Sequence, residues 1–226
     1  GNMTGFQVVE AAKRHPVYYC MEVDDYRRAC PLVGNGSGIL INAGYIYDTK
    51  LLQMLKRYQR GVCVEPLNEA SYEAFLEEPS EDMRRELAGL LTTAGKVLEP
   101  FHCGAVLKQF EPMEQPVLYV PGADEFLDYT LGEGGFSGFL EGFDLGGADA
   151  FGGFDSGYGT KLYLNGRNSL IRRLAQVQDP DIVTDMMRVL YVHAILAGHY
   201  NLGERETEIL NTGLIRLIGY GLGGEV

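Results

Sequence analysis

The sequence predicts an α/β protein in two parts: a small parallel αβα subdomain over residues 1–102, then a mixed α+β domain over residues 103–226 that ends in a helical bundle. In the first part, short apolar runs alternate with segments of helical period, which is typical of parallel strands joined by crossover helices. In the second part, three helical segments follow one another after residue 167, each with apolar residues at three- and four-residue steps.

The expected elements of the first part are bounded by turn and cap residues. Asp48 is expected to cap a helix that ends at Gly61, Asn68 to cap a second helix, and Ser80 to open a third that continues to Leu98. The run from Gly38 to Asn42 is apolar between its terminal Gly and Asn and predicts a buried strand. The strands of this part are expected at residues 17–21, 38–42 and 62–64.

The stretch from residue 161 to residue 203 organises the second part. A β-prone run ends at Asn165, where an Asn-Gly pair predicts a structural turn. Asn168 or Ser169 can cap the helix that follows, and Asp179 before Pro180 predicts the start of a longer one. Two further runs, at residues 105–111 and 117–120, are expected to form a small antiparallel sheet with the run at residues 162–164.

The last helix, expected from Glu204 to Tyr220, carries more apolar surface than the remaining chain can cover. A second copy of the same chain is the commonest partner for such a surface, and folding back on its own domain is the alternative. The residues expected to serve helix packing and the dimer interface are Met187, Leu190, Leu210, Leu214 and Leu217.

These residues also carry a resemblance. KLYLNGRNSLIRRL at residues 161–174, followed by MMRVLYVHAILAG at residues 186–198, resembles the C-terminal domain of the heat-shock protein 90 family of chaperones. GILINAGYIYD at residues 38–48, and VLKQF to PVLYV over residues 106–120, look like a divergent bacterial branch of that family. The similarity covers about two thirds of the chain and rests on the order of these segments.

The resemblance implies that residues 1–102 are the end of the family's middle domain and that residues 103–226 are its dimerisation domain. It implies an ATP-dependent, cytoplasmic chaperone of protein folding and the stress response that works as a homodimer and binds unfolded client proteins. ATP and Mg would be bound by an N-terminal domain upstream of this chain. No catalytic, cofactor or metal residue is expected in the chain itself.

Residues 121–160 differ in composition from the rest. They hold 12 of the 30 glycines, 6 of the 10 phenylalanines, eight acidic residues and no basic one. We expect a mobile acidic insertion at the position where the family meets its clients. Four apolar residues at helical spacing predict a client-contact face, with an acidic tether as the alternative. They are Phe136, Phe139, Leu140 and Phe143.

Composition limits the other partners. A net charge of -12 argues against nucleic acid, and no apolar run approaches the ~20 residues of a membrane span. The chain opens without a signal peptide, and its first two residues, Gly-Asn, suggest that the natural protein extends further upstream. The four cysteines lack a C-x-x-C pair and are expected to be reduced.

The sequence is also compatible with two other classes of function. One is a small α/β enzyme with its site at the carboxyl ends of the strands, near Asn42, Gly44 and Glu65. The other is a purely structural interaction module. A concentration-dependent dimer favours the chaperone, whereas a monomer with a deep polar pocket at the strand ends favours the enzyme.

Overall fold

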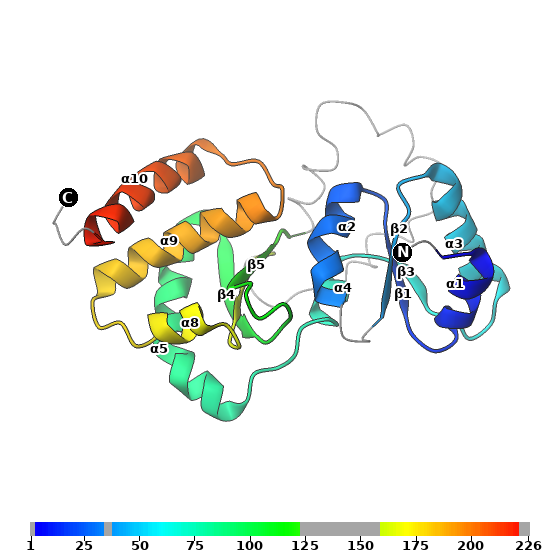
Figure 1. The fold of residues 1–226 in the computed structure, drawn as a ribbon, viewed down its shortest axis with the longest axis horizontal. Helices are drawn as coiled ribbons and strands as arrows, with labels where there is room; N and C mark the ends of the chain where they lie inside the picture. The colour runs from blue at the N-terminus through cyan, green and yellow to red at the C-terminus, as the bar shows by residue number, and fades with distance from the viewer. Residues whose placement is uncertain (1–2, 34–37, 123–158, 222–226) are drawn as a thin grey trace. The chain divides into compact units, whose positions relative to one another are not determined.

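The computed structural model describes residues 3–33, 38–122 and 159–221 (Figure 1). These residues form a mixed α/β structure with one parallel and one mixed sheet. The chain divides into two compact units. Unit 1 comprises Gly1–Glu78 with Gln109–Gln115, and unit 2 comprises Pro79–Lys108 with Pro116–Val226.

Unit 1 contains a three-stranded parallel sheet, as the alternation of apolar runs and helical segments predicts. Its strands lie in the order β2-β1-β3, so Val17 of the central strand pairs with Ile39 on one side and Val64 on the other. β2 lies at the edge of the sheet and is only half-buried, which corrects the expectation of a buried strand. The strands are β1 (Val17–Cys20), β2 (Ile39–Asn42) and β3 (Val64–Pro66).

Helices lie on both faces of this sheet. Figure 1 shows α1 and α3 on one side and α2 and α4 on the other. Because side chains alternate along a strand, Tyr19 faces the core under α1 and α3, whereas the ring of Tyr18 meets Phe75 at 5.1 Å. The helical elements are α1 (Gly5–Ala12), α2 (Val23–Ala29), the 3-10 turn η1 (Cys30–Val33), α3 (Ile46–Tyr58) and α4 (Glu69–Glu73).

Two helix starts in unit 1 test the expected caps. Asn68 caps α4, because its side-chain oxygen accepts a hydrogen bond from the backbone N–H of Ser71 at 2.9 Å. The cap position of α3 is Tyr45 rather than Asp48, so that prediction is wrong. Asp48 lies in the first turn of α3, where a carboxylate is favoured by the helix dipole without bonding the terminal amides.

The sheet of unit 2 is mixed, with the order β4-β6-β5. β5 is antiparallel to β6, as expected, but β4 is parallel to it, so the expectation of a wholly antiparallel sheet is wrong. Apolar patterning fixes which residues lie in a strand and leaves the direction of its neighbour open. The strands are β4 (Cys103–Lys108), β5 (Val117–Val120) and β6 (Thr160–Asn165), and every residue of β6 is buried.

Long helices cover this sheet. α5 packs on β4 and α9, and α9 packs on β5, around a core that includes Leu98, Leu162 and Met187. α5 therefore belongs to unit 2, and the predicted boundary at residue 102 lies inside that unit, between the end of η2 and the start of β4. The helical elements are α5 (Glu81–Leu98), the 3-10 turn η2 (Glu99–Phe101), α8 (Ser169–Leu174), α9 (Pro180–Ala197) and α10 (Glu204–Gly221).

Candidate dimerisation interface

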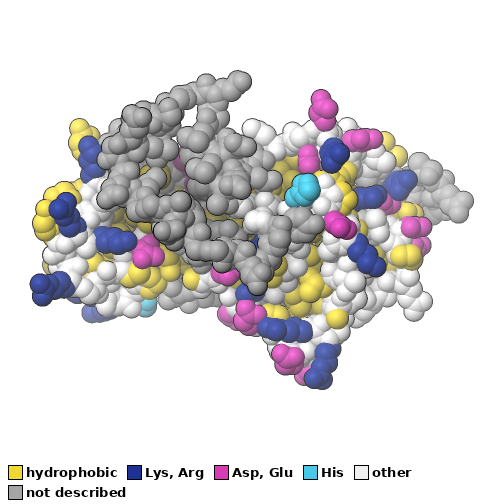
Figure 2. Space-filling model, turned by 180° about the vertical axis from the view of Figure 1, so that it is seen from behind, with side chains coloured by type: hydrophobic (Ala, Val, Ile, Leu, Met, Phe, Trp, Pro, Cys, Tyr) yellow, Lys and Arg dark blue, Asp and Glu magenta, His cyan; other side chains and the backbone are white. Residues whose placement is uncertain are grey.

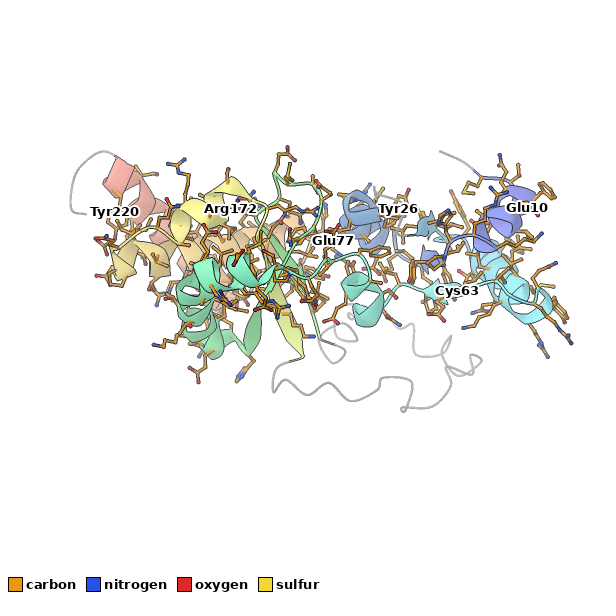
Figure 3. The ribbon with its side chains drawn as sticks, turned by 90° about the horizontal axis from the view of Figure 1, so that it is seen from below. Glu10, Tyr26, Cys63, Glu77, Arg172 and Tyr220 are labelled. Atoms are coloured by element: carbon orange, nitrogen blue, oxygen red, sulfur yellow. The ribbon has the colours of Figure 1, made fainter. Side chains whose placement is uncertain are left out.

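The turn after β6 positions the helices that follow it. Asn165 is fully buried, and its backbone N–H donates to the carbonyl of Pro116 at 2.9 Å. Its side-chain oxygen accepts the N–H of Arg167 at 3.1 Å, which closes the turn that the Asn-Gly pair predicts. Arg172 (labelled in Figure 3) donates from Nε to the carbonyl of Gly166 at 2.9 Å and ties α8 to the same turn.

The caps of α8 and α9 agree with the sequence. Asn168 accepts the N–H groups of Leu170 and Ile171 at 2.9 and 3.3 Å. Asp179 accepts the N–H groups of the next turn at 2.9 and 3.4 Å, with Pro180 as the first residue of α9. Each of these starts follows from local chemistry, because a short polar side chain bonds amides that the helix leaves unpaired.

α9 is buried between the sheet and α10. Met187 is 0% exposed and Leu190 is 7% exposed, and both belong to the core of unit 2. A helix that is apolar nearly all round is expected to be buried in this way. These two residues therefore contribute to helix packing within the chain.

One face of α10 lies close against α9. Gly213 is buried, and a Cβ added there would lie 2.6 Å from Cγ2 of Val189. Ile209 and Leu210 are partly buried against the core of unit 2. Glycine at this position lets the two helix backbones approach more closely than any side chain would allow.

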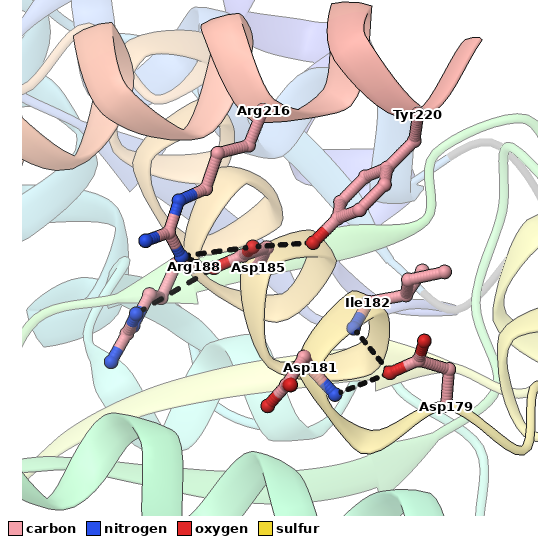
Figure 4. A network of polar contacts seen from close by, with 7 residues as sticks. All are labelled: Asp179, Asp181, Ile182, Asp185, Arg188, Arg216 and Tyr220. Atoms are coloured by element: carbon pink, nitrogen blue, oxygen red, sulfur yellow. Dashed lines mark hydrogen bonds and ion pairs between the residues drawn. The ribbon is translucent and has the colours of Figure 1, made fainter. Parts of the chain in front are cut away.

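A polar network joins the same two helices (Figure 4). Asp185 on α9 is 4% exposed, and the guanidinium of Arg216 on α10 lies 3.3 Å from its carboxylate. Arg188 adds a second cation at 3.6 Å, and the Tyr220 hydroxyl donates to the carboxylate at 3.4 Å. Partial burial of the Tyr220 phenol, together with the negative charge of Asp185, raises the pKa of Tyr220 above its ordinary value.

The opposite face of α10 carries apolar side chains that are exposed to solvent. Leu214 is 45% exposed, Ile215 is 57% exposed and Ile218 is 60% exposed. The three recur at one- and three-residue steps, so they lie on one side of the helix, away from Gly213. We call this surface the α10 face.

The structure separates the predicted interface residues into groups. Met187 and Leu190 are buried in the core, Leu210 is partly buried between α10 and that core, and Leu214 lies on the α10 face. The side chain of Leu217 lies outside the part of the chain that the structure describes, as do the four residues of the predicted client-contact face. Those four are Phe136, Phe139, Leu140 and Phe143.

Sequence reasoning missed three features of this site. Ile215 is not among the residues expected at the interface, although it lies between Leu214 and Ile218 in an apolar stretch of the same helix. Gly213, a glycine in the middle of a helix, signalled a close approach. Asp185, a carboxylate within the apolar stripe of α9, signalled a buried partner.

The strand ends of unit 1 were the alternative site. Asn42 accepts the N–H of Gly44 at 3.1 Å, and Thr49 donates to the carbonyl of Ala43 at 3.0 Å, so these groups stabilise the start of α3. Glu65 lies 4.0 Å from the ammonium of Lys56 on α3. Within residues 3–33, 38–122 and 159–221, the structure holds no group of three or more His, Cys, Asp or Glu side chains placed to bind a metal ion.

Comparison with known proteins gives no assignment. No protein-family model matches the chain, and no curated protein matches it in sequence. Within the described part of the chain, every helix is too short or too polar to span a bilayer.

Proposed function

We propose that this chain is the C-terminal half of a divergent ATP-dependent chaperone of the heat-shock protein 90 type, and that unit 2 holds two protomers together. The main observation in support of this proposal is the exposed α10 face. Leu214, Ile215 and Ile218 are about half exposed on a helix whose other side is already packed against α9.

Burial of this face by a second copy is favourable. Three aliphatic side chains that go from half exposed to buried contribute on the order of 1 kcal/mol each. A two-fold axis beside α10 would bring α9 and α10 of both protomers into a four-helix arrangement with the same surface on each side. In this proposal unit 1 is the αβα end of the middle domain and unit 2 is the dimerisation domain.

The proposed mechanism is mechanical. An N-terminal domain upstream would bind and hydrolyse ATP with Mg, and the present part would keep the two protomers joined while the clamp closes on a client. This part would be non-catalytic and would hold no cofactor. The resemblance of the segments at residues 161–174 and 186–198 supports the assignment, and the exposed thiols of Cys30 and Cys63 accord with a reducing, cytoplasmic setting.

Sedimentation equilibrium over a range of protein concentrations tests the dimer. We expect the wild-type chain to reach twice the mass of the monomer, and Leu214→Glu/Ile218→Glu to remain a monomer because each added carboxylate would be buried without a partner. Leu170→Glu, a change of a 36% exposed leucine on α8, is the matched control and should leave the dimer intact.

A wild-type chain that stays monomeric at about 100 µM would exclude the proposal, since a constitutive clamp requires a tighter contact. Equal loss of dimer in the Leu170→Glu control would place the interface elsewhere.

Client binding needs a separate experiment because the proposed contact residues lie outside the described part of the chain. Phe136→Ser, Phe139→Ser and Phe143→Ser, combined in one variant, should abolish binding of an unfolded model protein while the mass of the dimer is unchanged. Unchanged binding would remove client contact from this segment.

A further inference from the structure

A second exposed apolar surface lies in unit 1, on the outer side of α3. Tyr47 is 78% exposed, Leu51 is 64% exposed, Met54 is 54% exposed and Tyr58 is 69% exposed. Single exposed apolar side chains are normal on a protein surface. A contiguous row of large ones on one helix is unusual and marks a contact surface.

The spacing of these residues is that of a helix-pairing seam. They recur at steps of four, three and four, which keeps them within about 60° of one another around the helix. The opposite side of α3 holds the helix on the sheet through Leu52, which is 6% exposed. α3 is therefore fixed on one side and free to pair along the other, and we call that free side the α3 seam.

Two cations border the seam on one flank. Lys50 and Arg57 are seven residues apart and exposed, so both lie beside the apolar row and one above the other. The guanidinium carbon of Arg57 lies 5.9 Å from the centroid of the Tyr58 ring. In a pair of helices, residues at this flanking position form ion pairs with the partner and so select it.

The charge of this region differs from that of the chain. The whole chain carries -12, whereas residues 46–60 hold four basic residues and a single acidic one. Figure 2 shows hydrophobic and basic side chains side by side at the end of unit 1 that carries α3. A cationic, aromatic seam on an acidic protein is complementary to an acidic, apolar surface.

We propose that α3 is a docking site for an acidic amphipathic helix of another protein, which lies along the seam with its apolar residues against Leu51 and Met54 and its carboxylates opposite Lys50 and Arg57. This site belongs to unit 1 and does not depend on the dimer proposed for unit 2. The mode is the recognition of a helix by its regularly spaced apolar anchors.

The charge pattern disfavours the other occupants of the seam. If two copies of α3 paired antiparallel, Lys50 of one copy would face Arg57 of the other, and the like charges would repel. If they paired parallel, Lys50 would face the uncharged Leu55 and form no ion pair. An anionic bilayer or a nucleic acid would attract the four basic residues but repel the remainder of a chain with 31 carboxylates against 19 basic residues. An acidic helix satisfies both the apolar row and the cations without approaching that remainder.

The size of the seam sets the expected affinity. A helix of 13 residues is about 20 Å long, so one seam of this length forms a small and transient contact. We expect a dissociation constant on the order of 10 µM for a helix that matches it.

The experiment uses the full chain and two synthetic peptides of three heptads. Both peptides carry Leu at the seam positions, and one has Glu and the other Lys at the flanking positions. Fluorescence anisotropy of labelled peptide should show binding of the Glu peptide and at least tenfold weaker binding of the Lys peptide, because only the first forms ion pairs with α3.

Variants of the chain separate docking from loss of folding. Lys50→Glu/Arg57→Glu should reverse the preference and bind the Lys peptide, which also shows that the variant is folded. Arg14→Glu/Arg60→Glu makes the same change in net charge at exposed positions outside the seam and should keep the wild-type preference. Leu51→Ser/Met54→Ser should bind neither peptide while its circular dichroism matches that of the wild type.

Several results would overturn the proposal. Absence of binding at about 100 µM peptide, or equal affinity for both peptides, would do so directly. Self-association that Leu51→Ser/Met54→Ser abolishes would assign the seam to a second copy of the chain. Sedimentation with phosphatidylserine vesicles that the same variant abolishes would assign it to a membrane surface.

Discussion

The guanidinium of Arg216 on α10 lies 3.3 Å from the carboxylate of Asp185, a buried residue of α9 thirty-one positions earlier. This pair is part of the polar network that links the two helices of the proposed dimerisation bundle. The side chain of Asp185 is 5% exposed and that of Arg216 is 51% exposed, so the carboxylate depends on its partners more than the cation does.

Arg216→Ala should reduce the free energy of unfolding by about 1–2 kcal/mol, because a buried carboxylate loses one charged hydrogen-bond donor. Urea denaturation followed by circular dichroism measures this change. Arg205→Ala, an exposed residue in the first turn of the same helix, should change stability by less than about 0.5 kcal/mol. If both substitutions change the free energy of unfolding equally, the ion pair between Arg216 and Asp185 makes no specific contribution to stability.

Tyr220 should make the stability of the α9–α10 pair sensitive to alkaline pH. Partial burial and the negative charge of Asp185 raise the pKa of Tyr220 above its ordinary value of 10.0, so the folded state favours the neutral phenol. Its contribution is present below pH 10.0 and is lost as the pH rises through the folded pKa. As the pH rises above 10.0, Tyr220→Phe should lose stability less steeply than the wild type.

Denaturation midpoints measured at several pH values give that comparison. If the denaturation midpoints of the wild type and Tyr220→Phe change in parallel with pH, ionisation of the Tyr220 phenol does not affect stability, and the proposed effect of Asp185 on it is wrong.

Gly213→Leu should separate α10 from α9, because the added side chain would occupy the space of Val189. The expected loss of stability is about 1–3 kcal/mol, the usual range for overpacking. Thermal unfolding measures it, and a substitution at a helical glycine of α5 is the comparison. A Cβ added at Gly89 meets nothing within 4 Å, so Gly89→Ala should stabilise by about 0.4–1 kcal/mol. A stable Gly213→Leu variant would contradict the close approach of the two helices.

The cysteines should differ in reactivity. Burial raises the pKa of Cys20 to about 12, so its thiol is almost entirely protonated at pH 8. Cys103 is also buried, whereas Cys30 and Cys63 are exposed. Mass spectrometry after brief alkylation of the native chain at pH 8 should find label on Cys30 and Cys63 first, and on all four after unfolding in urea. Labelling of Cys20 as fast as Cys63 would contradict its burial.

Much of the local structure was predictable from the sequence. Asn68, Asn168 and Asp179 cap the helices that their positions predict, and the strand at residues 161–165 ends at the expected Asn-Gly turn. These features depend on residues within a few positions of one another, so composition and spacing contain the necessary information.

The candidate interface was predictable only in outline. An apolar stripe at helical spacing says that a helix is buried but not how many neighbours share the burial. Met187 and Leu214 have the same character in the sequence, yet the first is 0% exposed and the second 45% exposed. The difference arises because α9 packs between the sheet and α10, whereas α10 packs on one side only.

The sequence by itself determined the α/β class, the parallel sheet of unit 1, most helix starts and the acidic character of residues 121–160. Only the tertiary structure decided that β4 runs parallel to β6, that Asp185 meets Arg216, and that α3 and α10 each expose an apolar row. The physical reason is the range of the interactions. Caps and turns are local, whereas strand direction, buried ion pairs and exposed faces depend on which distant segments meet.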